Sequence, residues 1–232
     1  MLRPVGHIGG YTVVKPIGRG KYGVCYKAFK SDGHPVVLKR FYKNPTKGRF
    51  APDDHEAVIL SGLEHPAIPE FLGVLNEKAG YFFVLEYKNG MTLEQIIFKH
   101  RHRFCDGEIF NVGSQLLKIM SYIHSRNVIH GDLRLSNIIM DDNGHISLID
   151  FGLARYTGED GLDFDLDYSC FGNILLYLLY SAYPKSGKKI WYEELDLLPG
   201  QRAYLMRLLR LTEPFTSDTA VVEGFRKNFS IN

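Results

Sequence analysis

Two short segments carry side chains that can handle protons and metal ions. The first runs from His130 to Asn137 with the sequence HGDLRLSN, and the second, the tripeptide DFG, begins at Asp150, thirteen residues after Asn137. Asp132 can accept a proton from an attacking hydroxyl group, while Asn137 and Asp150 can hold Mg²⁺ on the phosphates of a nucleotide. Their order and spacing predict phosphoryl transfer from ATP, with ATP and Mg²⁺ as the cofactors.

A glycine-rich segment lies upstream, between strands predicted over 11–17 and 23–29. Gly18, Gly20 and Gly23 form the pattern G-x-G-x-x-G, and glycine lets a backbone approach phosphate oxygens without a Cβ clash. A dinucleotide-binding motif shares this pattern but opens a helix, whereas the residues after Gly23 favour a strand. The segment therefore indicates a lid over a triphosphate.

A lysine stands near the end of the apolar strand predicted over 35–42. An inward-pointing Lys39 is costly to bury unless it is paired. Glu56, on a helix predicted over 53–63, is the nearest suitable partner. Such a pair would hold the Lys39 ammonium over the α- and β-phosphates of a nucleotide.

Turn residues and apolar patterning divide the chain into two lobes, so the predicted fold class is α+β. Strands over 71–75 and 81–87 complete a five-stranded N-lobe with one helix, about residues 1–87. A polar break marks a hinge over about 86–91. The C-lobe, 92–232, is mainly helical, with a long helix ending near Arg126, a hairpin over 137–148, and helices over 167–183, 201–211 and 218–227.

The overall composition is that of an ordinary globular protein. A net charge of +2, with 45% hydrophobic and 23% charged residues, gives no argument for nucleic acid or a membrane as the main partner. Basic clusters at 99–103 and 185–189 are typical of solvated surface. The three scattered cysteines fit no disulfide or zinc pattern, and no signal peptide or bilayer-spanning run is visible. We therefore expect a cytoplasmic location.

Taken in order, these elements resemble the eukaryotic-type (Hanks-type) serine/threonine protein kinases over nearly the whole chain. The similarity includes the glycine loop, the strand with Lys39, Glu56 ahead of the sequence LEHP, the HGD and DFG segments, and a buried helix led by Asp167, which braces the HGD loop in that family. The resemblance implies one two-lobed kinase-like domain over residues 1–232, similar to small bacterial members. It also implies a protein serine or threonine as the acceptor.

The resemblance further implies roles for individual residues. Asp132 would be the catalytic base, supported by Lys39 and Glu56. Arg134, which stands where many of these kinases carry lysine, would reach the γ-phosphate. Asn137 and Asp150 would bind the metal ion. The nucleotide would be contacted by Ile17, Gly18, Gly20, Gly23 and Lys39, by the hinge residues Glu86 and Tyr87, and by Val24, Val37 and Ile139 on the two sides of the adenine.

Some features depart from the family pattern. Gly131 replaces the arginine that pairs with a phosphorylated activation-loop residue, which favours an enzyme that needs no such phosphorylation. Only fourteen residues separate Gly152 from Asp167, and the usual Ala-Pro-Glu floor of the peptide site is missing. Ser217 stands where the arginine partner of that glutamate is expected.

Alternatives to a protein kinase therefore stay open. The HGD loop and the short segment after DFG also resemble tRNA-modification kinase/ATPases and aminoglycoside or choline phosphotransferases. The acceptor can then be a small molecule, or the chain can act as an ATPase of an accessory complex. A pseudokinase that binds partners without chemistry is a further alternative, although the filled catalytic positions argue against it.

Overall fold

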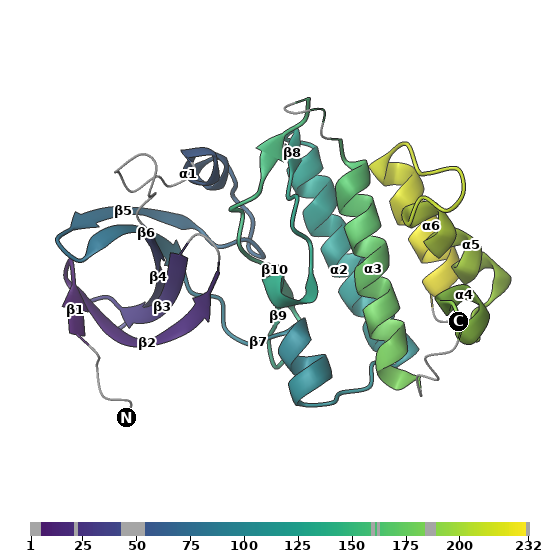
Figure 1. The fold of residues 1–232 in the computed structure, drawn as a ribbon, viewed down its shortest axis with the longest axis horizontal. Helices are drawn as coiled ribbons and strands as arrows, with labels where there is room; N and C mark the ends of the chain where they lie inside the picture. Colours follow the sequence, from purple (N-terminus) through teal and green to yellow (C-terminus); the bar gives the residue numbers. More distant parts are fainter. Residues whose placement is uncertain are drawn as a thin grey trace. The chain divides into compact units, whose positions relative to one another are not determined.

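The computed structural model describes residues 6–20, 23–42, 54–158, 161, 163–183 and 189–230. The chain divides into two compact units, Met1–Lys88 and Asn89–Asn232. The N-terminal unit is built on an antiparallel sheet and the C-terminal unit is mainly helical (Figure 1), which confirms the predicted α+β fold class. The expected helix start at Asp53 and the basic residues 185–188 lie outside the described residues. Within these ranges, no helix combines the length and the apolar composition needed to cross a membrane.

Six strands form the sheet of the N-terminal unit, in the order β1-β2-β3-β4-β6-β5. The five predicted strands did not include β1. This strand has only three residues, too few to show an alternation of polar and apolar side chains. Gly9 and Gly10, both at positive φ, connect it to β2, and such a glycine pair is a hairpin signal. The strands are β1 (Gly6–Ile8), β2 (Tyr11–Arg19), β3 (Gly23–Phe29), β4 (Pro35–Phe41), β5 (Phe71–Glu77) and β6 (Gly80–Glu86).

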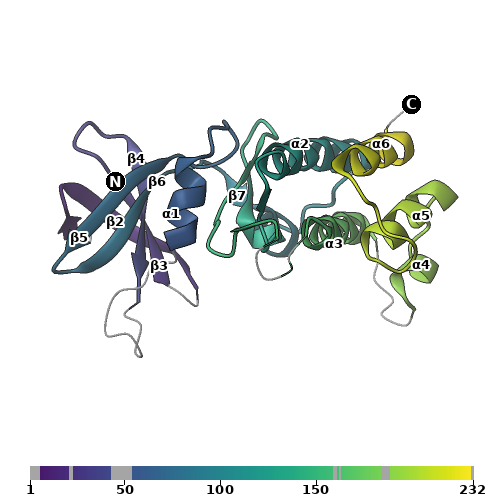
Figure 2. The same cartoon turned by 90° about the horizontal axis from the view of Figure 1, so that it is seen from above.

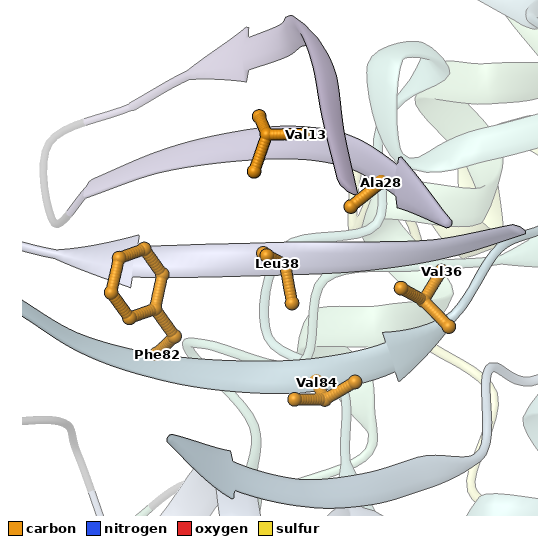
Figure 3. Packing of buried hydrophobic residues seen from close by; sticks show 6 residues of the cluster. All are labelled: Val13, Ala28, Val36, Leu38, Phe82 and Val84. Atoms are coloured by element: carbon orange, nitrogen blue, oxygen red, sulfur yellow. The ribbon is translucent and has the colours of Figure 1, made fainter. Parts of the chain in front are cut away.

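The two faces of this sheet have different neighbours. One face carries a buried apolar cluster, which Figure 3 shows: Val13, Ala28, Val36, Leu38, Phe82 and Val84. On the other face, Lys39 of β4 is paired in register with Cys25 of β3 and Phe83 of β6. Residues directly opposite one another in a sheet share a face, so these three side chains lie together. Helix α1 (Asp54–Ser61) contacts β5 and lies beside the sheet in Figure 2.

The C-terminal unit is organised around two long helices. Helix α2 packs against α3 and α6, and α5 packs against α3 and α6 (Figure 1). The sequence analysis did not anticipate β7, η1, β8, β11 and α4, each of at most five residues. The elements are β7 (Met91–Thr92), η1 (Gln95–Lys99), α2 (Asp106–His124), β8 (Val128–Ile129), η2 (Leu135–Asn137), β9 (Ile138–Met140), β10 (Ile146–Leu148), β11 (Arg155–Tyr156), α3 (Asp165–Ala182), α4 (Trp191–Glu194), α5 (Pro199–Leu208) and α6 (Asp218–Phe229).

The end of α2 delivers the chain to the HGD segment. The predicted apolar stripe of α2 is buried, and the helix stops at His124, slightly before the expected end near Arg126. Asn127 follows at φ 58° and donates its N–H to the carbonyl oxygen of His124 at 2.8 Å. Asparagine is one of the few non-glycine residues that adopt this left-handed conformation readily. The turn sends the chain into β8, directly ahead of His130.

We expect Gly23→Ala to destabilise the sheet, because a Cβ at this position would overlap with the main-chain carbonyl of Arg40 on β4. Overpacking of this kind costs roughly 1–3 kcal/mol of the free energy of unfolding. Gly20→Ala is the matched control, since a Cβ there meets nothing within 4 Å. Denaturant titrations of the two variants should differ clearly. Equal midpoints would contradict the pairing of β3 with β4.

Candidate active site

A buried carboxylate on α3 holds the start of the HGD segment. Asp167 is fully buried, and it accepts the N–H of His130 at 2.8 Å and the N–H of Gly131 at 3.0 Å. The Nε2 atom of His124 lies 3.1 Å from the same carboxylate. The structure therefore contains the brace that the resemblance implied for Asp167, and it leaves Asp132 as the next residue along the chain.

Hydrogen bonds fix the ring of His130 in one neutral tautomer. Its Nε2 lies 3.3 Å from the carbonyl oxygen of Ile149, which can only accept a hydrogen bond. Its Nδ1 lies 3.3 Å from the N–H of Asp132, which can only donate. The proton therefore resides on Nε2. Burial lowers the pKa of His130, in agreement with a neutral ring. This ring connects the backbone of Asp132 to the residue that precedes Asp150.

Asp132 and Asn137 contact each other directly. The Nδ2 group of Asn137 donates to the main-chain oxygen of Asp132 at 2.9 Å and to its Oδ2 at 3.0 Å. Arg134 places its Nε 3.2 Å from the same Oδ2, although most of its side chain is exposed. The main-chain oxygen of Asn137 accepts the N–H of Ile149 at 2.8 Å. The side chains of Asp132, Arg134 and Asn137 are thus brought together. Asp150 directly follows Ile149, whose N–H is bonded to Asn137.

Asp150 occupies a strained backbone position between two fixed neighbours. Its φ is 65°, a left-handed conformation that is uncommon for residues with a side chain. Ile149 is bonded to Asn137 on one side. On the other side Phe151 is fully buried and packs edge to face against His130, with ring centroids 4.7 Å apart. Conformations of this kind persist where the surroundings over-determine them, and they cluster at functional sites.

The backbone of the following segment explains why residue 131 is glycine. Strand β11 pairs with β8, so the chain after DFG returns across the start of the HGD segment. Gly131 has a φ of 74°, and a Cβ there would lie 2.8 Å from the carbonyl oxygen of Leu153. No side chain, and therefore no arginine, fits at this position without a shift of that segment.

The lysine of the N-terminal unit has the partner expected from the sequence. Lys39 Nζ lies 2.7 Å and 2.8 Å from the two carboxylate oxygens of Glu56 on α1. The two side chains are only 10% and 1% exposed. The predicted pairing is confirmed. Because both charges are buried, loss of either partner would be strongly destabilising.

The register of the sheet separates two of the residues predicted to contact the nucleotide, Val24 and Val37. Val24 lies on the face of Ala28 and the buried apolar cluster, because side chains alternate along a strand. Cys25 is opposite Lys39, and Val37 lies two residues from Lys39 on the same strand. Val24 and Val37 therefore lie on opposite faces of the sheet, and a contact of Val24 with the nucleotide stays a prediction. Cys25, like Val37, is half-buried and shares the Lys39 face.

The predicted hinge residues are partly committed to the N-terminal unit itself. The N–H of Glu86 donates to the carbonyl oxygen of Glu70 at 2.9 Å, and its carboxylate lies 2.8 Å from Lys88 Nζ. The ring of Tyr87 lies 4.0 Å from Lys27 Nζ. The main-chain N–H of Glu86 is thus occupied.

The described part of the glycine loop, up to Gly20, is exposed to solvent. Ile17 is 43% exposed and lies at an irregularity in β2, and Gly18 is paired with Cys25. Beyond the strand, the N–H of Gly20 donates to the carbonyl oxygen of Gly23 at 3.0 Å. In the C-terminal unit Ile139 is half-buried on β9.

Two residues beside the site were not predicted from the sequence. One is Cys25, which a count of alternating positions back from Lys39 could have found once the strand register was known. The other is Asp218 on α6, which contacts His124 and for which the sequence offered no signal. Its neighbour Ser217 caps α6, with Oγ accepting the N–H of Ala220 at 3.3 Å.

Comparisons with known proteins agree on one family. A protein kinase domain is matched over residues 11–169. The probable serine/threonine-protein kinase YbdM of Bacillus subtilis is 31% identical over 229 residues, which is 94% of this chain and 88% of that protein. The CTD kinase subunit alpha of Schizosaccharomyces pombe is 35% identical over 210 residues, 87% of this chain but 32% of that protein. Serine/threonine-protein kinase PknD of Protochlamydia amoebophila is 27% identical over 257 residues, 95% of this chain and 25% of that protein.

Gly131→Ala should lower the free energy of unfolding by roughly 2 kcal/mol or more, because it combines a left-handed φ with a close approach to Leu153. Gly158→Ala is the control: Gly158 has a φ of 84°, but a Cβ there meets nothing within 4 Å. Chemical denaturation should rank Gly131→Ala as the less stable variant. If both variants lost the same stability, the overlap with Leu153 would have no part in selecting glycine.

Proposed function

Because this chain belongs to the protein kinase family, we propose that it transfers the γ-phosphoryl group of Mg·ATP to a serine or threonine hydroxyl group of a protein. The observation that carries the proposal is the hydrogen-bonded set of Asp132, Asn137 and Ile149, with Asp150 adjoining it. The serine/threonine kinases among the relatives support this choice of acceptor.

Asp132 is the proposed general base. Asn137 and Arg134 both contact its Oδ2, so we assign the acceptor hydroxyl to Oδ1. The hydroxyl oxygen attacks the γ-phosphorus, its proton passes to Asp132, and the bond between the γ-phosphorus and the β–γ bridging oxygen breaks to release ADP. Arg134, which is largely exposed, can turn its guanidinium to the transferred phosphoryl group.

Asn137 and Asp150 are the proposed ligands of Mg²⁺. A carboxylate and an amide oxygen are the hard donors that Mg²⁺ prefers, and this ion commonly takes its other ligands from phosphates and water. The two hydrogen bonds from Asn137 Nδ2 to Asp132 select the amide orientation in which Oδ1 is the ligand atom. Across the described ranges no group of three or more His, Cys, Asp or Glu side chains forms a metal site, and the two-ligand set does not need one. The bound ion would offset phosphate charge.

The N-terminal unit would supply the remaining nucleotide contacts. Lys39, oriented by both oxygens of Glu56, would act as a point charge on the α- and β-phosphates. Cys25 and Val37 lie on the same face of the sheet and would meet the adenine, and the carbonyl of Glu86 would accept a hydrogen bond from its amino group. We place the hinge at about residues 86–91, around the boundary between the two units.

A transfer assay separates the possible acceptors. The purified protein is incubated with γ-labelled Mg·ATP, alone and with a cell lysate. Label on protein serine or threonine supports the proposal. Label on a small metabolite would contradict it in favour of a small-molecule phosphotransferase, and release of free phosphate alone would favour an ATPase. Prior phosphatase treatment should leave the activity intact, because Gly131 has no side chain with which to bind a phosphorylated residue.

Asp132→Ala should reduce turnover at least about a hundredfold, as expected when a general base is removed. Asp142→Ala is the control, because Asp142 is exposed at the turn between β9 and β10 and belongs to the same part of the chain. Initial rates at saturating ATP measure the effect. Turnover of Asp132→Ala equal to that of the control would remove Asp132 from the mechanism.

Saturating Mg·ATP should slow the alkylation of Cys25, since this residue shares the Lys39 face of the sheet. The exposed Cys105 is an internal control whose rate should not change. Burial raises the pKa of Cys170 to about 11, so that thiol should react slowly in either condition. Peptide mass spectrometry after timed labelling gives the three rates. If Mg·ATP did not protect Cys25 from alkylation, Cys25 would not be the residue that contacts the adenine.

A further inference from the structure

A histidine at the end of α2 is enclosed by carboxylates from two other helices. The side chain of His124 is fully buried. Its Nε2 lies 3.1 Å from Oδ2 of Asp167 on α3, and its Nδ1 lies 2.7 Å from Oδ1 of Asp218 on α6. Phe164 stacks on the ring, with centroids 4.2 Å apart. The site described above uses Asp167 but leaves Asp218 without a role.

The partners of this ring require it to be charged. An ionised carboxylate can only accept hydrogen bonds, so both ring nitrogens of His124 donate and the ring is an imidazolium. Burial alone would lower the pKa of His124, but the hydrogen bonds to Asp167 and Asp218 outweigh it and raise the pKa. Burial likewise opposes ionisation of Asp218, and the hydrogen bond from His124 nevertheless lowers the pKa of that carboxyl.

Tyr168 is a further titratable group of this cluster, and the charges of Asp163 and Asp165 act on it. The hydroxyl of Tyr168 on α3 donates to Oδ1 of Asp218 at 2.9 Å. Burial raises the pKa of Tyr168, so the phenol stays neutral and remains a donor. Asp218 is also the first residue of α6, where the helix dipole favours a negative charge. The environment of Asp218 therefore favours its ionised form.

A continuous chain of contacts leads from α6 to the HGD segment. Asp218 holds one nitrogen of His124, and the other nitrogen holds Oδ2 of Asp167. The same Oδ2 accepts the N–H of His130, while Oδ1 accepts the N–H of Gly131. The Asp167 carboxylate is thus oriented by a hydrogen bond from His124, and the position of the next residue, Asp132, depends on that carboxylate.

We propose that Asp218 is a positioning residue for phosphoryl transfer, acting through His124 and Asp167 on the loop that carries Asp132. This role rests on the proposed function of Asp132. Asp218 contacts His124 and Tyr168, and we infer no direct role for it in binding the nucleotide. Its loss should therefore lower kcat and leave the KM for ATP nearly unchanged.

The charge on His124 gives this role a pH dependence of known sign. The imidazolium exists below its raised pKa. When the pH rises through that value, one ring nitrogen becomes an acceptor facing a carboxylate, the brace weakens, and kcat falls. Asp218→Asn removes one of the two charges that raise the pKa of His124, so kcat should begin to fall at a lower pH than in the wild-type enzyme.

The test compares Asp218→Asn with Asp165→Asn. Asp165 also lies at the start of α3, but it pairs with Arg210 at 3.1 Å rather than with His124. We expect kcat of Asp218→Asn to fall between about 5- and 100-fold, in the range of small errors in catalytic geometry, with the KM for ATP within about twofold. The control should keep the wild-type kcat and pH profile. Equal kcat and profile in the wild type and Asp218→Asn would overturn the proposal.

A second measurement, made on the wild-type protein, does not depend on activity or on the correct folding of a variant. The ring resonances of His124, assigned with His124→Gln, are titrated by NMR in the wild-type protein. A pKa above the ordinary histidine value supports the proposal, and a value at or below it would overturn it. If Asp132→Ala retained full turnover, the proposed function would fail. If Asp132→Ala were inactive while Asp218→Asn behaved as wild type, only the role of Asp218 would fail.

Discussion

The buried carboxylate of Asp167 is the interaction on which the rest of the site depends. It lies on α3 and accepts hydrogen bonds from the backbone at His130 and Gly131. An unpaired buried carboxylate would be costly, so its acceptor positions must be filled for the fold to be stable. The same bonds that satisfy the carboxylate fix the backbone on the N-terminal side of Asp132. Stability of the helical unit and placement of the proposed base are therefore consequences of one set of contacts.

The other residues of the site in the C-terminal unit are linked to this backbone by a short series of hydrogen bonds. The neutral ring of His130 joins Asp132 to the carbonyl of Ile149, and the N–H of Ile149 joins Asn137. Asp150 is then held in a left-handed conformation between two anchored residues. The lysine of the N-terminal unit is organised in the same way, by a buried carboxylate rather than by contact with solvent. In both units an acidic side chain outside the reacting set orients the group that would meet the nucleotide.

The parts of the site that rest on local sequence patterns could be predicted, whereas those that rest on contacts between distant residues could not. The strand with Lys39 and the helix with Glu56 could be paired because a buried lysine needs a partner and few acids were near. The motif named Val24 without a strand register, and a shift of one residue moves a side chain to the other face of a sheet. The contact of His124 with Asp218 spans 94 residues. It arises from the packing of α2 against α6, which no local pattern encodes. Gly131 was recognised as a departure, but its cause, the carbonyl of Leu153, became visible only in the structure.

We propose that Asn137 and Asp150 form a magnesium site on a nucleotide whose phosphoryl group Asp132 helps to transfer. Calorimetric titration of ATP into the wild-type protein and into Asp150→Asn, with Mg²⁺ and with a chelator, tests it most directly. We expect Mg²⁺ to tighten the binding of ATP by roughly tenfold or more in the wild type, about 1.4 kcal/mol, and Asp150→Asn to lose most of this gain. Identical affinities with and without Mg²⁺, or an undiminished magnesium effect in Asp150→Asn, would contradict it.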